Sequence, residues 1–239
     1  MWWLRCARRT GPWTCQRSAT CCSPGSTYRI DAGTARFGKI DVLVNNAGFG
    51  LFGLFEATSR EKIQEQFDVN VFGVMDVTRS ILPHFRKIRS GLIINISSGA
   101  GLFTLPMISL YCASKFALEG FSEALWYELA SQDIGVKLVV LHGGVSNTNF
   151  SERPANRVKD AALTDYNDFV ERTNQAFARM TAARSMISGD IARVIYEAAT
   201  DGTDRLRYLA GNDSRGFIRA KREMPDQDYV EFMRSKFRG

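Results

Sequence analysis

No stretch of the 239-residue sequence holds eighteen consecutive apolar residues, so the sequence predicts no membrane-spanning helix. Acidic side chains are missing from the first thirty positions, which carry five of the 31 basic residues. The rest of the chain is almost neutral, although the whole has a formal charge of +6. A nucleic-acid partner is not indicated, because the excess positive charge lies in one short segment.

Cysteine is scarce beyond the first thirty residues, where Cys112 is the only one. The other four stand near the start: Cys6, Cys15, Cys21 and Cys22. They include no C-x-x-C pair and have no histidine nearby, so their spacing does not indicate a metal site. A disulfide framework is not favoured either, since the remainder of the chain offers a single partner.

Residues 1–30 also lack the periodic hydrophobicity of a helix or a strand. An arginine-rich, acid-free start is typical of an organellar transit peptide, but adjacent tryptophans and adjacent cysteines suit an amphipathic helix badly. We interpret residues 1–30 as an atypical segment, disordered or derived from an incorrect start or a shifted reading frame. The chain shows no internal repeats or linkers, so we expect a single domain over residues 31–239.

From residue 31 onward, short apolar runs alternate with longer stretches of helical spacing, which predicts an α/β fold. The predicted strands are residues 40–44, 91–98, 136–141 and 206–211. The predicted helices are residues 59–86, 109–130, 165–180 and 188–200, with a further packed helix in the tail, residues 212–239. The run 136–141 is continuously apolar, as in a strand that is covered on both faces.

Polar motifs accompany these elements. The sequence Asn45-Asn46-Ala47-Gly48 follows the first predicted strand, Asn70 lies in the long helix, and Ser98 ends the next strand. Tyr111 and Lys115 are four residues apart on a helix, so they share a face on which the ammonium favours the phenolate. Together, in this order and at these spacings, the motifs resemble the short-chain dehydrogenase/reductase family. The resemblance covers about residues 31–239.

The resemblance implies a Rossmann-like, doubly wound parallel sheet and hydride transfer between a nicotinamide, NAD or NADP, and a carbonyl or alcohol substrate. It implies that Tyr111 donates or accepts the substrate proton, that Lys115 lowers the pKa of Tyr111 and binds the ribose, and that Ser98 binds the substrate oxygen. Asn70 would hold a water beside Lys115. The implied cofactor-binding residues are Asn46, Ala47, Gly48, Tyr111, Lys115, Gly144, Val145 and Thr148.

One half of the family pattern is missing. The family places three strands and a turn of the type Thr-Gly-x-x-x-Gly-x-Gly ahead of residues 40–44, and this sequence lacks those glycines. We therefore expect strands 4 to 7 of the family order, with strands 1 to 3 absent or replaced and binding of the cofactor impaired. Residues 40–44 would then form an exposed apolar edge. The match to G-x-G-x-x-G at Gly48 to Gly53 is interpreted as accidental, because the next helix signal is the capping box Thr58 to Glu61.

Alternatives remain at several points. Ser97 replaces Ser98 if the register shifts by one, and His142 would suit a hydrolase only with an orienting acid, for which no motif is present. A second hypothesis is a truncated, non-catalytic relative that at most dimerises. The resemblance implies a homodimer or homotetramer through residues 59–86 and 109–130, and a cytoplasmic enzyme. The aromatic residues Phe49, Phe52 and Phe55 favour an apolar substrate.

Overall fold

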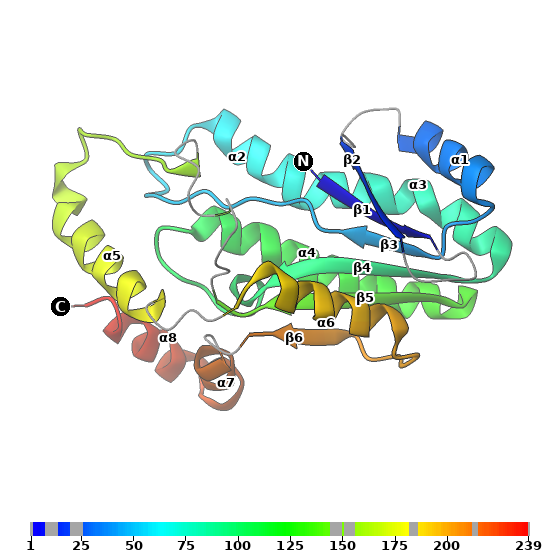
Figure 1. The fold of residues 1–239 in the computed structure, drawn as a ribbon. Helices are drawn as coiled ribbons and strands as arrows, with labels where there is room; N and C mark the ends of the chain where they lie inside the picture. Colours follow the sequence, from blue (N-terminus) through cyan, green and yellow to red (C-terminus); the bar gives the residue numbers. More distant parts are fainter. Residues whose placement is uncertain are drawn as a thin grey trace.

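The computed structural model describes residues 2–7, 14–19, 26–143, 150, 156–181, 186–211 and 215–238 (Figure 1). They form a six-stranded sheet with the order β2-β1-β3-β4-β5-β6. Its parallel part consists of β3 (Val42–Asn45), β4 (Gly91–Ser98), β5 (Ile134–Leu141) and β6 (Arg207–Ala210). These strands confirm the predicted α/β fold and the four predicted strands.

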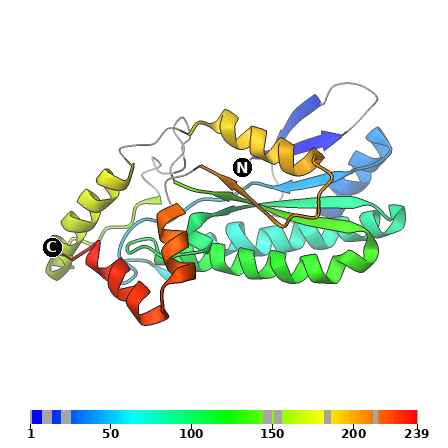
Figure 2. The same cartoon turned by 90° about the horizontal axis from the view of Figure 1, so that it is seen from below.

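Helices cover both faces of the parallel strands, which is why the strand sequences are almost continuously apolar. The helices α3 (Gly73–Ile88) and α4 (Ser109–Leu129) lie on one face, and α6 (Ser188–Thr200) lies on the other (Figure 2). Side chains alternate along β4 accordingly: Ile93 packs with α3 and α4, whereas Ile94 and Ile96 pack with α6.

The predicted helix over residues 59–86 is divided in the structure. An α-helical part, α2 (Arg60–Phe67), continues into a π-helical turn, η1 (Asp68–Phe72), and then into α3. The Ser59 hydroxyl caps α2 by accepting a hydrogen bond from the Lys62 N–H, one residue later than the predicted capping box. Residues 46–59 contain no helix, so the G-x-G-x-x-G match does not open one, as expected.

The N-terminal segment contributes a β-hairpin, although the sequence pattern predicts no regular structure there. The strands β1 (Trp2–Ala7) and β2 (Thr14–Ala19) pair with each other, and β1 also pairs antiparallel with β3. The helix α1 (Ser26–Phe37) follows and packs beside α3. The hairpin replaces the missing strands next to β3, so this edge is partly covered: Arg5 pairs with Leu43 and Cys6 with Val42.

The remaining helices gather near the carboxyl ends of the strands (Figures 1 and 2). They are α5 (Asn167–Thr181), α7 (Arg215–Glu223) and α8 (Asp226–Ser235). Apolar residues of all three pack around Phe103, in the segment that joins β4 to α4. Three short 3-10 turns complete the described elements: η2 (Gly99–Gly101), η3 (Ala130–Gln132) and η5 (Thr164–Tyr166).

Candidate active site

The predicted site residues lie at one end of the sheet. Ser98 is the last residue of β4, and Asn46 and Gly48 follow β3, so they stand at the carboxyl ends of neighbouring parallel strands. In open α/β sheets this is the end at which ligands bind. Tyr111 and Lys115 lie on the first turns of α4, which packs against β4. Asn70 reaches the same place from η1.

A buried polar network fixes the strands on which the site is built. The Asn45 amide donates to Asn95 Oδ1 over 2.8 Å and to Thr78 Oγ1 over 3.3 Å, and the Asn95 amide donates to Ser122 Oγ over 2.8 Å. All four side chains are buried. The network therefore ties β3 and β4 to α3 and α4, and Asn45, rather than the exposed Asn46, supports the sheet.

Two amides, Gln66 and Asn70, hold the loop after β3; we call them the amide pair. Both are fully buried and four residues apart, on α2 and η1. Asn70 accepts from the Phe49 N–H and donates to the Phe49 carbonyl and to Ser114 Oγ, at 2.9–3.1 Å. Gln66 accepts from the Leu51 N–H at 2.8 Å and donates to the Phe49 carbonyl at 2.7 Å.

Within the amide pair, Asn70 has a positioning role that is compatible with the predicted one. Both N–H groups of its amide and one acceptor position of Oδ1 are used within the protein. Its side chain therefore positions backbone, and at most one lone pair of Oδ1 is left for a water. The π-helical turn brings Asn70 to the Phe49 backbone, in keeping with the frequent occurrence of such turns at functional sites.

Tyr111 is almost completely enclosed, with 8% of its surface exposed. Burial raises the pKa of its phenol to about 12, and a hydrogen bond with Ser98 offsets part of that rise. The Ser98 hydroxyl also accepts from the Ala100 N–H at 3.2 Å, which orients it at the start of η2. The sequence predicts a lowered pKa for Tyr111; in the structure desolvation dominates and the direction is opposite.

Lys115 is also buried, with 6% of its surface exposed. Its ammonium donates to the Ile96 carbonyl over 2.9 Å and lies 5.8 Å from the centre of the Tyr111 ring. Burial lowers its pKa to about 8, while the charge of Glu119 raises it. Lys115 is therefore still mostly an ammonium at neutral pH, on the same helix face as Tyr111.

Two glycines allow the loop after β3 to pass close to these groups. A Cβ at Gly48 would lie 3.3 Å from Asn70 Oδ1 and 3.6 Å from Lys115 Nζ. A Cβ at Gly50 would lie 3.3 Å from Tyr111 Cδ2 and 3.2 Å from the ring of Phe150. A side chain at either position would crowd these groups, so glycine favours this close approach.

Aromatic and aliphatic side chains surround Tyr111. The ring of Phe150 lies edge-on to Tyr111 at 5.4 Å, and Phe52 lies edge-on to Phe150 at 6.3 Å. Ile108 and Leu105 complete this apolar cluster. Of the three phenylalanines predicted to favour an apolar substrate, Phe52 belongs to the cluster, whereas Phe55 is 62% exposed.

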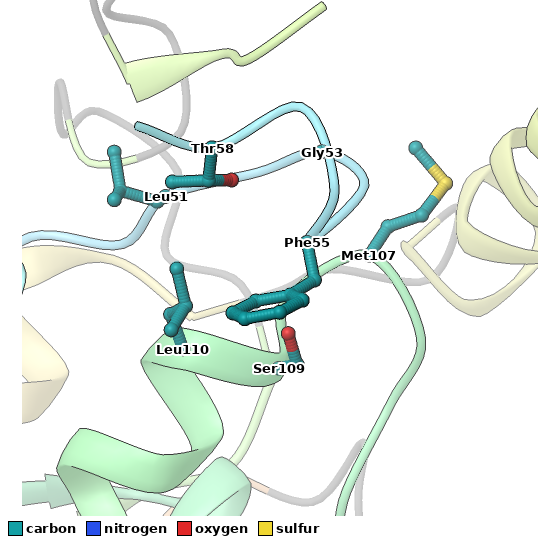
Figure 3. A pocket seen from close by; sticks show the side chains of 7 residues that line it. All are labelled: Leu51, Gly53, Phe55, Thr58, Met107, Ser109 and Leu110. Atoms are coloured by element: carbon teal, nitrogen blue, oxygen red, sulfur yellow. The ribbon is translucent and has the colours of Figure 1, made fainter. Parts of the chain in front are cut away.

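A shallow surface depression lies beside the start of α4, and Figure 3 shows the side chains that line it. Phe55 points toward Ser109 and Leu110, opposite Leu51 and Thr58. Met107, on the rim, has a positive φ of 59°, which is strained for a residue with a side chain. None of the lining residues belongs to the four predicted catalytic positions, so this depression adjoins the site without containing it.

His142 lies at the end of β5 and is fully buried. Burial lowers its pKa to about 4, with the nearby charges of Arg215 and Arg222 adding to the effect. Within the described part of the chain neither ring nitrogen has a hydrogen-bond partner, so no acid orients it as a hydrolase base. The predicted cofactor residues Gly144, Val145 and Thr148 lie outside the described residues.

The structure thus brings together the four predicted catalytic residues and the turn from Asn46 to Gly48. Residues that the sequence pattern did not single out are Gln66, Asn95 and Ser114. Asn95 and Ser114 are marked by a polar side chain at a core position of a strand or helix, whereas Gln66 looks like a surface position. No group of three potential metal ligands occurs among the residues described, and none of the described helices is long and apolar enough to cross a bilayer.

A parallel sheet with helices on both faces, and a buried Tyr/Lys pair at the carboxyl ends of its strands, defines a Rossmann-like α/β protein with an enzyme-type site. The chain belongs to the short chain dehydrogenase family, whose model matches residues 29–158. An uncharacterized oxidoreductase of Schizosaccharomyces pombe is 37% identical over 185 residues, which cover 77% of this chain and 75% of the relative.

Solved structures agree with this assignment. A short-chain dehydrogenase from Streptomyces avermitilis superposes with a TM-score of 0.74 at 28% identity, over 91% of this chain and 78% of that one. A metagenomic short-chain oxidoreductase in complex with NADP superposes with a TM-score of 0.55 at 26% identity, over 77% of this chain and 68% of that one.

Proposed function

We propose that the chain is an NAD(P)-dependent oxidoreductase that interconverts a carbonyl and an alcohol on an apolar substrate. The observation that carries the proposal is the buried arrangement of Ser98, Tyr111 and Lys115 at the carboxyl ends of β3 and β4. Complexes of related proteins with NADP support the choice of cofactor class. The cofactor would supply and accept the hydride, and the protein would supply the proton and the orientation.

The residues present fit the nicotinamide and ribose part of such a cofactor. Gly48 is exposed and approaches Lys115 Nζ with no side chain in between, so a ligand that lies over this turn would come near the ammonium. Asn46 and Ala47 precede Gly48 on the same turn, and two buried polar groups at the same strand ends, Ser97 Oγ and the His142 ring, have no partner within the described part of the chain. Lys115, Tyr111 and residues 46–48 would hold this part of the cofactor; Gly144, Val145 and Thr148 are proposed to complete it.

The phosphate part fits less well. Phosphate groups favour a glycine-rich turn at a helix N-terminus, and the strand next to β3 here belongs to an antiparallel hairpin instead. We therefore expect weak binding. A loss of ~3 kcal/mol would change a micromolar dissociation constant to roughly 0.1 mM.

In the proposed reaction Tyr111 donates its proton to the carbonyl oxygen during reduction and accepts it back during oxidation. A phenol with a pKa of about 12 is fully protonated at neutral pH and is therefore ready for the reductive direction. Ser98 donates a hydrogen bond to the same oxygen as charge develops on it. Lys115 stabilises the phenolate left behind, and Asn70 and Gln66 hold the loop that faces both residues.

The substrate is expected to be apolar around its reactive carbon. Phe52, Leu105, Ile108 and Phe150 surround Tyr111 and offer no charged group. A ketone or secondary alcohol with an apolar body would gain from burial against these side chains, whereas a charged substrate would lose hydration there.

We also propose a homodimer or homotetramer that uses one face of α4. Ala113, Phe116, Gly120, Ala124 and Tyr127 are exposed at helical spacing and carry no charge. Phe116 is 41% and Tyr127 is 63% exposed, and Phe72, on the turn η1 that packs against α4, is 47% exposed. An uncharged face of this kind on an otherwise charged surface is typical of an interface between subunits.

The alternative is a non-catalytic relative that only dimerises, which the antiparallel hairpin in place of the nucleotide-binding strands favours. A turnover assay distinguishes the oxidoreductase from the non-catalytic alternative. The chain is incubated with millimolar NADPH or NADH and a panel of apolar ketones, and the loss of absorbance at 340 nm is followed. The proposal predicts turnover that falls about 100-fold or more in Tyr111→Phe, because the proton donor is lost. The exposed Tyr127→Phe serves as the matched control and retains the rate; a folded wild-type chain without turnover favours the alternative.

A further inference from the structure

Glu119 lies one turn after Lys115 on α4 and is buried, with 5% of its surface exposed. It packs against η2: a Cβ at Gly101 would lie 3.0 Å from its Cγ and 2.9 Å from the Lys115 carbonyl oxygen. Burying a carboxylate costs free energy unless a positive charge is paired with it, so Glu119 is expected to have a basic partner.

The partner is Arg207, at the start of β6. Its Nε donates to Glu119 Oε2 over 2.9 Å, and its terminal nitrogen pairs with Glu123 Oε2. The two carboxylates differ in exposure: the side chain of Glu119 is 6% exposed and that of Glu123 is 41% exposed. Arg207 thus holds one carboxylate inside the protein and a second one at the surface.

The charge of Glu119 is only partly balanced by hydrogen bonds. Its second oxygen, Oε1, is buried and has no hydrogen-bond partner among the residues described. Glu119 and Lys115 are both buried and lie four residues apart on one face of α4, so the carboxylate is a neighbour of the ammonium and opposes the effect of burial on the pKa of Lys115.

The other groups around Lys115 are neutral. Tyr111 on α4 is protonated at neutral pH, β4 offers the Ile96 carbonyl and Ser98, and η1 with the loop after β3 offers Asn70 and Gly48. Glu119, one turn away on the same face of α4, supplies the negative charge next to this group.

We propose that Glu119, anchored by Arg207, is a positioning residue that keeps Lys115 in its ammonium form beside Tyr111. The inference rests on the proposed function, because an ammonium is needed there to stabilise the phenolate of Tyr111. It also gives a role to β6, the strand at the far edge of the parallel sheet. Arg207 on this strand holds the Glu119 carboxylate in place next to Lys115 on α4.

The experiment is a side-chain ¹⁵N NMR titration of the lysine ammonium groups in the full chain. The Lys115 resonance is assigned by its absence in Lys115→Met. In Glu119→Gln the midpoint of Lys115 is expected to fall by about one pKa unit or more, since a neighbouring opposite charge is removed. In Glu119→Asp, which keeps the charge, the midpoint moves much less. Glu123→Gln, which changes the exposed partner of the same arginine, is the matched control and leaves it unchanged.

Should Glu119→Gln fail to fold, the double variant Glu119→Gln/Arg207→Met removes both charges and costs less than leaving one unpaired. It too is expected to lower the Lys115 midpoint, by less than Glu119→Gln alone, because Glu119 is the nearer of the two opposite charges that are removed. An unchanged midpoint in a folded variant without Glu119 overturns the inference. The titration needs neither cofactor nor turnover, so its outcome is distinguishable from failure of the proposed function.

Discussion

The amide pair makes a specific prediction about the loop after β3. In Gln66→Ala, the buried N–H of Leu51 loses its acceptor, and the Phe49 carbonyl keeps only the bond from Asn70. Leaving a buried donor unpaired costs ~1–3 kcal/mol, and the lost bond to Phe49 adds ~0.5–1.5 kcal/mol. We therefore expect the free energy of unfolding to fall by roughly 2–4 kcal/mol.

The assay is urea unfolding followed by tryptophan fluorescence, with the midpoints compared at equal slopes. The matched control is Gln64→Ala, on the same helix two residues earlier. Gln64 also donates one side-chain hydrogen bond, to Asp68 Oδ1 at 2.7 Å, but in an exposed position. An exposed helical pair of this type contributes only ~0.2–0.5 kcal/mol.

Hydrogen exchange gives an independent readout. The amide of Leu51 should lose protection in Gln66→Ala and keep it in Gln64→Ala, because only the first variant releases the loop. The reasoning is refuted if Gln66→Ala destabilises the chain no more than Gln64→Ala does, or if Leu51 exchanges at the same rate in both variants.

Three further predictions concern charge and assembly. As pH falls from about 6.5 to about 4, the free energy of unfolding should fall by ~3 kcal/mol, because the unfolded state protonates His142 while the folded state keeps it neutral. Urea unfolding at pH 7 and 4.5 should show this fall in the wild type and not in His142→Phe. Lys115 has a lowered pKa in the folded state, so the free energy of unfolding should rise between about pH 8 and 10. Lys115→Met should abolish that rise and should be more stable than the wild type at pH 7 by roughly 2 kcal/mol. A variant that is less stable at pH 7 would argue against a buried ammonium. Gly120→Glu, whose Cβ would meet no atom within 4 Å in the monomer, should convert the proposed oligomer to monomers in light scattering, and an unchanged oligomer mass would remove α4 from the proposed interface.

Much of the fold is predictable from periodicity. The strand over residues 91–98 has the predicted limits, and the helix over residues 109–130 ends one residue earlier than predicted. The i, i+4 spacing of Tyr111 and Lys115 places them on one face, because helical geometry is local. The parallel strands were predictable because both of their faces are covered, which makes their sequences continuously apolar.

The remaining features depend on contacts between distant segments. Gln66 has the composition of a surface position on an amphipathic helix, and only the approach of the loop after β3 gives it buried partners. The π-helical turn at Asp68–Phe72 likewise follows from where Asn70 meets Phe49. The raised pKa of Tyr111 reflects desolvation by residues as distant as Phe150, which sequence spacing does not express.

The hairpin of β1 and β2 could not be predicted from the sequence for a different reason. Its sequence has no alternation that marks a buried face, so pattern analysis predicts no strand there. Its pairing with β3 uses backbone groups, which every residue offers at the open edge of a sheet. The division into an atypical segment, residues 1–30, and a single domain, residues 31–239, stays a prediction.

The measurement that tests the central claim most directly is a fluorescence titration of the chain with NADPH and NADH, after gel filtration has shown a single folded species. The account predicts saturable binding with a dissociation constant of roughly 0.1 mM, weakened tenfold or more in Gly48→Val, whose side chain would fill the space beside Lys115. A folded chain that binds neither nucleotide at millimolar concentration would contradict the account and leave a catalytic arrangement without its cofactor.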